Sequence, residues 1–230
     1  NPDLLAIVQA PKHALDLSRR AYYATLTHID HQIRLVIGYL RENGLLDNTI
    51  VVFTSDHGEM MGSHGMLHKE VLYQESIRVP LLMRVPWITD EYKQIAGHTS
   101  QIDLVPTLLG LMGVPLPSRL EGKSLEPVLR GETSLEENAV FIETNGPLIR
   151  AEAGVPWPSW QPWRTVISGD GWKLNLSTVD QCELYDLNED PTEENNLYDD
   201  AGQKDRISSM TTLLQQWQQE TDDDALLPEV

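Results

Sequence analysis

The chain has 230 residues, of which 40% are hydrophobic, and its formal net charge is −18. This length allows one large domain or a domain with a small appendage. The negative charge argues against nucleic acid and against an anionic membrane surface as partners. A single cysteine, Cys182, excludes an intrachain disulfide, and no apolar run approaches the length of a membrane span. Residues 180–230 hold 15 acidic and 2 basic residues, which we interpret as a solvated surface.

An amphipathic helix is predicted over residues 17–43. Its apolar positions recur at intervals of three and four: Leu26, Ile29, Ile33, Val36, Ile37 and Leu40. Gly44 suits the C-cap of this helix, because glycine readily adopts the left-handed conformation found there. Residues 1–16 are polar and contain prolines, so we expect a loop before the helix.

A short strand is predicted over residues 50–54. The run is apolar and rich in β-branched residues, a pattern typical of a strand buried on both faces of a parallel sheet. A second apolar run, residues 79–85, predicts a neighbouring strand. Residues between two such strands lie at a sheet edge, where open α/β folds bind ligands.

The first strand ends at Asp56 and His57, which offer a carboxylate oxygen and an imidazole nitrogen as metal ligands. The following glycine-rich loop carries His64, His68 and Lys69. An Asp-His pair after a strand is also typical of an Asx-turn or a helix cap. Three histidines, a lysine and three glycines in one short segment favour a functional site over turn chemistry alone.

The remaining elements suggest a change of architecture after residue 137. A short helix is predicted over residues 101–113, with Asp103 as its capping carboxylate rather than a catalytic group. Beyond residue 138, short strands alternate with turns, at residues 139–144, 164–168, 172–177 and 183–187. They predict a small antiparallel sheet, with a helix at residues 210–220 covering one face.

Residues 153–164 read AGVPWPSWQPWR and carry Trp157, Trp160 and Trp163. Aromatic faces can stack on sugar rings, so these tryptophans are candidate substrate-binding residues. The alternative is that they only pin a long loop onto the sheet, since tryptophan is usually well buried.

Several segments in order resemble the second half of a sulfatase, in the alkaline-phosphatase-like superfamily. They read TSDHGE, GSHGMLHK, YQESIRVPLL, QIDLVPTLLGLMGVPLP and, later, DGWKLNL followed by CELYDLNEDPTEENNL. The resemblance implies an α/β fold, part of an alkaline-phosphatase-like sandwich with a central sheet, followed by a small α+β subdomain. It supports a division into residues 1–137 and residues 138–230.

The resemblance implies hydrolysis of a sulfate ester, from a glycan among other substrates, with the help of a divalent metal. Asp56 and His57 would bind the metal, which the family suggests is Ca²⁺, although Mn²⁺ and Mg²⁺ also suit these ligands. Lys69 would supply a point charge to the anion or the leaving oxygen, and His64 and His68 would contact the ester. Lys69 and His64 are the candidate catalytic residues. The alternative for Lys69 is a solvated surface side chain.

The sulfatase nucleophile is a formylglycine made within a C-x-P-x-R motif, and this sequence contains no such motif. The resemblance therefore implies that an N-terminal half of the same protein supplies the nucleophile. We expect this chain to be inactive alone, and we expect a periplasmic or secreted location. The alternatives are a phosphodiesterase or phosphonate monoester hydrolase of the same superfamily, or a non-catalytic glycan-binding module.

Overall fold

The computed structural model describes residues 12–69, 71–145, 162–178 and 180–229. The chain divides into two compact units, Asn1–Tyr92 and Lys93–Val230. Each unit is described by itself. The domain boundary expected at residues 137/138 stays a prediction.

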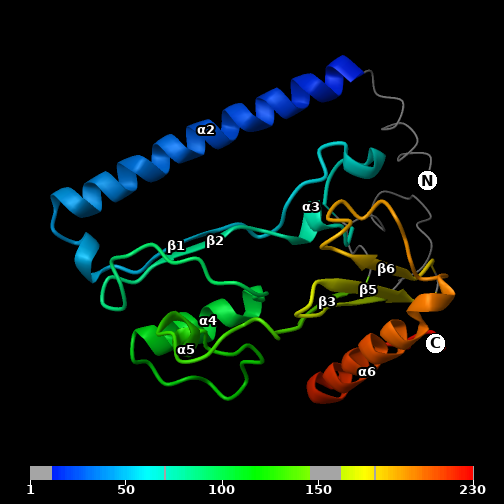
Figure 1. The fold of residues 1–230 in the computed structure, drawn as a ribbon. Helices are drawn as coiled ribbons and strands as arrows, with labels where there is room; N and C mark the ends of the chain where they lie inside the picture. Colours follow the sequence, from blue (N-terminus) through cyan, green and yellow to red (C-terminus); the bar gives the residue numbers. More distant parts are fainter. Residues whose placement is uncertain (1–11, 70, 146–161, 179, 230) are drawn as a thin grey trace. The chain divides into compact units, whose positions relative to one another are not determined.

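The first unit begins with one long helix, α2 (Lys12–Glu42), seen in blue in Figure 1. The helix starts five residues before the expected position, so the loop predicted for residues 12–16 is wrong. It ends at Glu42, and Gly44 closes it as expected, with φ +68° and its N–H donated to the carbonyl of Arg41. No described residue of α2 is buried, although its sequence is amphipathic.

Two strands follow, β1 (Val51–Thr54) and β2 (Leu81–Arg84), which pair side by side. Residues 79–85 therefore contain the expected neighbouring strand. The pairing is antiparallel, with Val51 opposite Arg84. The connection between the strands holds the short η2 (Ser63–Gly65) and the one-turn helix α3 (Gln74–Ile77). Phe53 is 41% exposed, so the burial on both faces expected for β1 is not met within the described residues.

The second unit opens with η3 (Gln101–Asp103) and α4 (Leu104–Leu111), then α5 (Glu126–Leu129). Asp103 is buried, and its carboxylate accepts from the backbone N–H groups of Ser100 at 3.3 Å and Lys123 at 2.8 Å. The capping role predicted for Asp103 is thus confirmed. The one-turn helix α5 had no signal in the sequence analysis.

The antiparallel sheet of this unit has the strand order β3-β4-β5-β6. The strands are β3 (Val140–Thr144), β4 (Trp163–Ile167), β5 (Trp172–Ser177) and β6 (Glu183–Asp186), which confirms the four strands expected. The 3-10 turn η5 (Ala201–Gln203) leads into α6 (Lys204–Thr221), which begins six residues earlier than predicted. One core joins this helix to the sheet: Val166, Leu174, Leu176, Leu184, Ile207, Met210 and Leu214.

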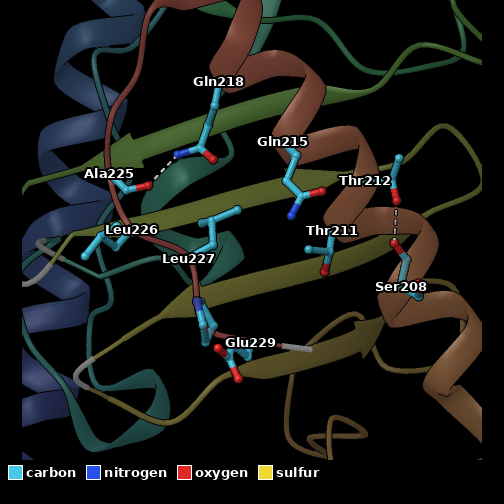
Figure 2. A pocket seen from close by; sticks show the side chains of 10 residues that line it. Ser208, Thr211, Thr212, Gln215, Gln218, Ala225, Leu226, Leu227 and Glu229 are labelled. Carbon is cyan, nitrogen blue, oxygen red and sulfur yellow. Dashed lines mark hydrogen bonds between the residues drawn. The ribbon is translucent and has the colours of Figure 1, made fainter.

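After α6 the chain turns back along the helix. The amide of Gln218 donates to the carbonyl of Ala225 at 2.8 Å, drawn as a dashed line between these two residues in Figure 2. A cavity of about 420 Å³ lies between this tail and α6. Among the described residues, no helix is both long enough and apolar enough to cross a membrane.

Candidate active site

The turn after β1 holds Asp56 in a fixed orientation. Its carboxylate Oδ1 accepts the backbone N–H of His57 at 3.0 Å and the hydroxyl of Ser55 at 3.3 Å. The hydrogen bond from the His57 backbone is the main cause that lowers the pKa of Asp56 below its ordinary value. The side chain of Asp56 is 84% exposed, so an ionised carboxylate faces outward from the turn.

The imidazole of His57 points its second nitrogen at this carboxylate. Nδ1 lies 2.7 Å from the carbonyl oxygen of Gly58, which can only accept, so Nδ1 carries the proton. In the neutral ring, Nε2 is then a lone-pair donor, and it lies 3.6 Å from Oδ2 of Asp56. A backbone carbonyl that fixes the tautomer of a metal-binding histidine is a common outer-shell arrangement. Asp56 and His57 thus direct two potential ligand atoms to one place.

Gly58 anchors this turn against α3. Its N–H donates to the carbonyl of Ser76 at 2.7 Å. A Cβ added to Gly58 would lie 1.9 Å from the carbonyl oxygen of Glu75, far inside any allowed contact. Only glycine therefore permits this close approach of the two backbones.

The loop that follows is closed by its own backbone. The N–H of Met60 donates to the carbonyl of His68 at 2.9 Å, and that of Gly62 donates to Met66 at 2.7 Å. Met60 is 1% exposed and fixes the base of the loop. Five loop residues have positive φ, namely Met61, Gly62, His64, Gly65 and His68. Because several of these are not glycine, the loop holds an unusual conformation that the surrounding contacts must enforce.

The structure places the loop residues predicted to bind substrate as follows. The ring of His64 is stacked on Tyr73, with centroids 3.8 Å apart and planes inclined by 8°. His68 is exposed, and Lys69 is half-buried with its carbonyl oxygen accepting from the hydroxyl of Ser76. The roles predicted for these three residues stay predictions.

Of the three candidate tryptophans, Trp163 is the first residue of β4, opposite Thr144 and Ser177. Trp157 and Trp160 lie outside the described residues. Stacking on a substrate stays a prediction for all three.

The pair Asp56 and His57 fits a divalent metal in chemistry and orientation, but it is incomplete as a metal centre. Metal ions in proteins take at least four ligands, and Ca²⁺ takes six to eight. Among the described residues, no cluster of three or more histidine, cysteine, aspartate or glutamate side chains could hold a metal. The pair therefore supplies only two of the ligands that such an ion needs.

Two residues of this region were not singled out from the sequence. Ser76 is 2% exposed and forms hydrogen bonds both with Gly58, in the turn after His57, and with Lys69. The ring of Tyr73 stacks on the ring of His64. Both lie in the segment YQESIRVPLL, which stands out only by its resemblance to a family.

Residues 8–114 match the family model described as Sulfatase. The chain is 31% identical over 211 residues to N-acetylglucosamine-6-O-sulfatase of Bacteroides thetaiotaomicron, a match that covers 89% of this chain and 36% of that protein. It is 34% identical over 193 residues to arylsulfatase K of Xenopus laevis, with 80% of this chain and 34% of that protein covered.

Solved structures are similar to this chain as well. A protein in complex with its substrate D-glucosamine-2-N,6-O-disulfate aligns with a TM-score of 0.76 and 30% identity, over 88% of this chain and 40% of that one. Phosphonate monoester hydrolase of Agrobacterium radiobacter aligns with a TM-score of 0.79 and 29% identity, over 90% and 42%. This chain thus spans between 34% and 42% of the length of these proteins. The sequence matches and the shared fold agree: the chain belongs to the sulfatase family, in the alkaline-phosphatase-like superfamily.

Proposed function

We propose that this chain is part of a sulfatase that hydrolyses sulfate esters with a divalent cation, and that it supplies part of the metal and sulfate site. One observation carries the proposal: Oδ2 of Asp56 and Nε2 of His57 lie 3.6 Å apart on the turn after β1. Both atoms are acceptors when the imidazole is neutral. Two acceptors facing each other favour a bound cation between them.

The residues of the chain would divide the chemistry between them. Asp56 and His57 would hold the cation, for which Ca²⁺ is our choice, while Mn²⁺ and Mg²⁺ suit the same donor atoms. The bound metal would offset charge on the non-bridging oxygens of the ester. The ammonium of Lys69 would bind the sulfate as a compact point charge, and His64 and His68 would flank the ester.

We propose that an N-terminal half of the same protein supplies the nucleophile, expected to be a formylglycine, and the other metal ligands. The short span relative to N-acetylglucosamine-6-O-sulfatase supports this proposal. So do the exposed apolar side chains of unit Asn1–Tyr92: on α2 Tyr23 is 67% exposed and Val36 60%, and on β2 Leu82 is 56% exposed. Large apolar surfaces of this kind are normally covered by another part of a fold or by a partner.

For the substrate we propose a sulfated sugar. Two similar proteins are associated with sulfated sugars. One is named N-acetylglucosamine-6-O-sulfatase, and the other is in complex with D-glucosamine-2-N,6-O-disulfate. Trp157, Trp160 and Trp163 are our candidates for contact with the sugar ring. A periplasmic or secreted location is part of the same proposal.

The second candidate function is phosphonate monoester hydrolysis, which the structural similarity to the Agrobacterium radiobacter enzyme favours. A glycan-binding role without catalysis is the third. The test is turnover of matched aryl sulfate, aryl phosphate and aryl phosphonate esters by the full-length protein. We expect the sulfate ester to be preferred, and a preference for the phosphonate would select the second function.

The Lys69→Ala variant is the residue-level test. If Lys69 binds the ester anion, kcat/KM should fall by about 10² or more, because a charge-assisted contact in the site is lost. Lys93→Ala is the matched control, since Lys93 is exposed. Near-normal kinetics for Lys69→Ala would assign Lys69 to the solvated surface. If the unmutated protein turned over none of the three esters, the glycan-binding role would be the one supported.

A further inference from the structure

We propose that Ser76 is a positioning residue that fixes Lys69 relative to the metal-binding turn. The inference rests on the proposed function and adds to it a residue that acts through Lys69. Ser76 is 2% exposed and lies in α3. Its carbonyl accepts the N–H of Gly58 at 2.7 Å, and its hydroxyl donates to the carbonyl of Lys69.

These two bonds join segments with different proposed tasks. Gly58 directly follows His57, so the carbonyl of Ser76 holds the segment with the two metal ligands. The hydroxyl of Ser76 holds the backbone of the residue whose ammonium would bind the sulfate. One buried residue therefore connects the turn of the cation site to the backbone of the lysine.

The two bonds can be separated by mutation. Any residue at position 76 retains the backbone carbonyl, so the bond to Gly58 survives in a Ser76→Ala variant. Only the hydroxyl bond to Lys69 is lost. The loop itself should stay closed, because the bonds of Met60 to His68 and of Gly62 to Met66 do not involve Ser76.

Loss of the bond from the Ser76 hydroxyl to the Lys69 carbonyl should mainly change the position of the Lys69 ammonium. A side chain that binds a reacting group loses much of its effect when it is displaced by about 1 Å, a shift that can cost about 10² in rate. The loss of one hydrogen bond, with the rest of the loop intact, should cost only part of that factor. We therefore expect Ser76→Ala to lower kcat/KM about tenfold and to leave the affinity for Ca²⁺ unchanged.

A double-mutant cycle tests whether Ser76 acts through Lys69. The full-length protein, Ser76→Ala, Lys69→Ala and the double variant are compared for kcat and KM with an aryl sulfate, and for Kd of inorganic sulfate by calorimetry. We expect the double variant to equal Lys69→Ala in both measurements, because nothing remains for Ser76 to position. Ser76→Thr, which keeps a hydroxyl, should recover most of the activity.

A merely structural role would give a different pattern. Ser168→Ala is the matched control, since Ser168 is also buried and its hydroxyl donates to the carboxylate of Asp170 at 2.5 Å, in the other unit. The Ser168→Ala variant should be less stable than the unmutated protein but should bind sulfate with the same Kd. Full additivity of Ser76→Ala and Lys69→Ala, a tenfold loss of Ca²⁺ affinity in Ser76→Ala, or an unchanged sulfate Kd in that variant would overturn the proposal. The Kd of inorganic sulfate tests the positioning role of Ser76 even if the protein turns over no ester. A complete lack of turnover would count against the proposed function and not against the role of Ser76.

Discussion

Gly58→Ala should loosen the metal-binding turn. The new Cβ would lie 1.9 Å from the carbonyl oxygen of Glu75 and 2.9 Å from its carbon. A normal contact requires the turn and α3 to separate by about 1 Å, which would break the bond of Gly58 to Ser76. Overpacking typically costs about 1–3 kcal/mol and the lost hydrogen bond about 1 kcal/mol. We expect a loss of about 2–4 kcal/mol in the free energy of unfolding.

Urea unfolding and ester turnover of the full-length variant measure the two consequences. Turnover of the folded protein should fall by about 10², because Asp56 and His57 move with the turn. Gly38→Ala is the matched control: a Cβ at Gly38, in α2, would meet nothing within 4 Å. It should raise stability by about 0.5–1 kcal/mol, since alanine favours helix over glycine. A Gly58→Ala variant as stable and as active as the unmutated protein would refute the close approach of the turn to α3.

Three further outcomes are expected. The 230-residue chain alone should bind Ca²⁺ weakly, because Asp56 and His57 are too few ligands, and a sub-micromolar Kd by calorimetry would contradict this. In the full-length protein, alanine at Trp157, Trp160 or Trp163 should raise KM for a sulfated glycan and leave a small aryl sulfate nearly unaffected; equal losses on both substrates would indicate a packing role. The chain alone should fold only in part and show no sulfatase activity, which size-exclusion and turnover assays can check, and a stable, active monomer would rule this out.

The sequence was informative where the signal is local. Apolar spacing and Gly44 predicted the body and end of α2, and turn residues predicted all four strands of the C-terminal sheet. The predicted start of α6 is six residues too late, because its first buried residue, Ile207, lies before the predicted helix at residues 210–220. A buried residue in the first two turns of a helix can be assigned only once its partners in the sheet are known.

The direction of strand pairing could not be predicted in the same way. An apolar run predicts burial, but the partner of β1 and its antiparallel direction depend on a non-local contact with β2. The same limit applies within the candidate site. Asp56 and His57 are adjacent in sequence and could be named, whereas Ser76 reaches Gly58 across 18 positions and has no pattern of its own.

The tail after α6 is held by a buried ion pair between Arg164 and Asp223. The guanidinium donates twice to the carboxylate, from Nε to Oδ2 at 2.7 Å and from Nη2 to Oδ1 at 2.5 Å. The side chain of Arg164 is 3% exposed and that of Asp223 is 10% exposed. Arg164 also donates to the amide oxygen of Asn145 at 3.0 Å, so the pair connects the end of β3, the start of β4 and the tail. A bidentate, buried pair of this kind is stronger than a surface ion pair.

This pair should make part of the stability dependent on acid pH. The hydrogen bonds from Arg164 lower the pKa of Asp223 from 3.8 to about 2. Because the pKa is depressed in the folded state, the contribution is complete above pH 3.8 and is lost as pH falls through about 2. Its upper bound is about 2 kcal/mol, with about half remaining at pH 3.

The difference in unfolding free energy between the unmutated protein and Asp223→Asn is therefore the quantity to measure across this range. It should be constant from pH 5 to 7 and shrink steadily between pH 4 and 2.5. Glu126→Gln is the matched control, because Glu126 pairs with Arg130 one helical turn away at a more exposed site. Its effect should stay below about 1 kcal/mol, as for surface pairs in general. An Asp223→Asn difference that stays constant down to pH 2.5 would mean that Arg164 does not hold Asp223 in its ionised form. The tail would then be retained by other contacts, among them the packing of Leu227 on the core and the bond of Gln218 to Ala225.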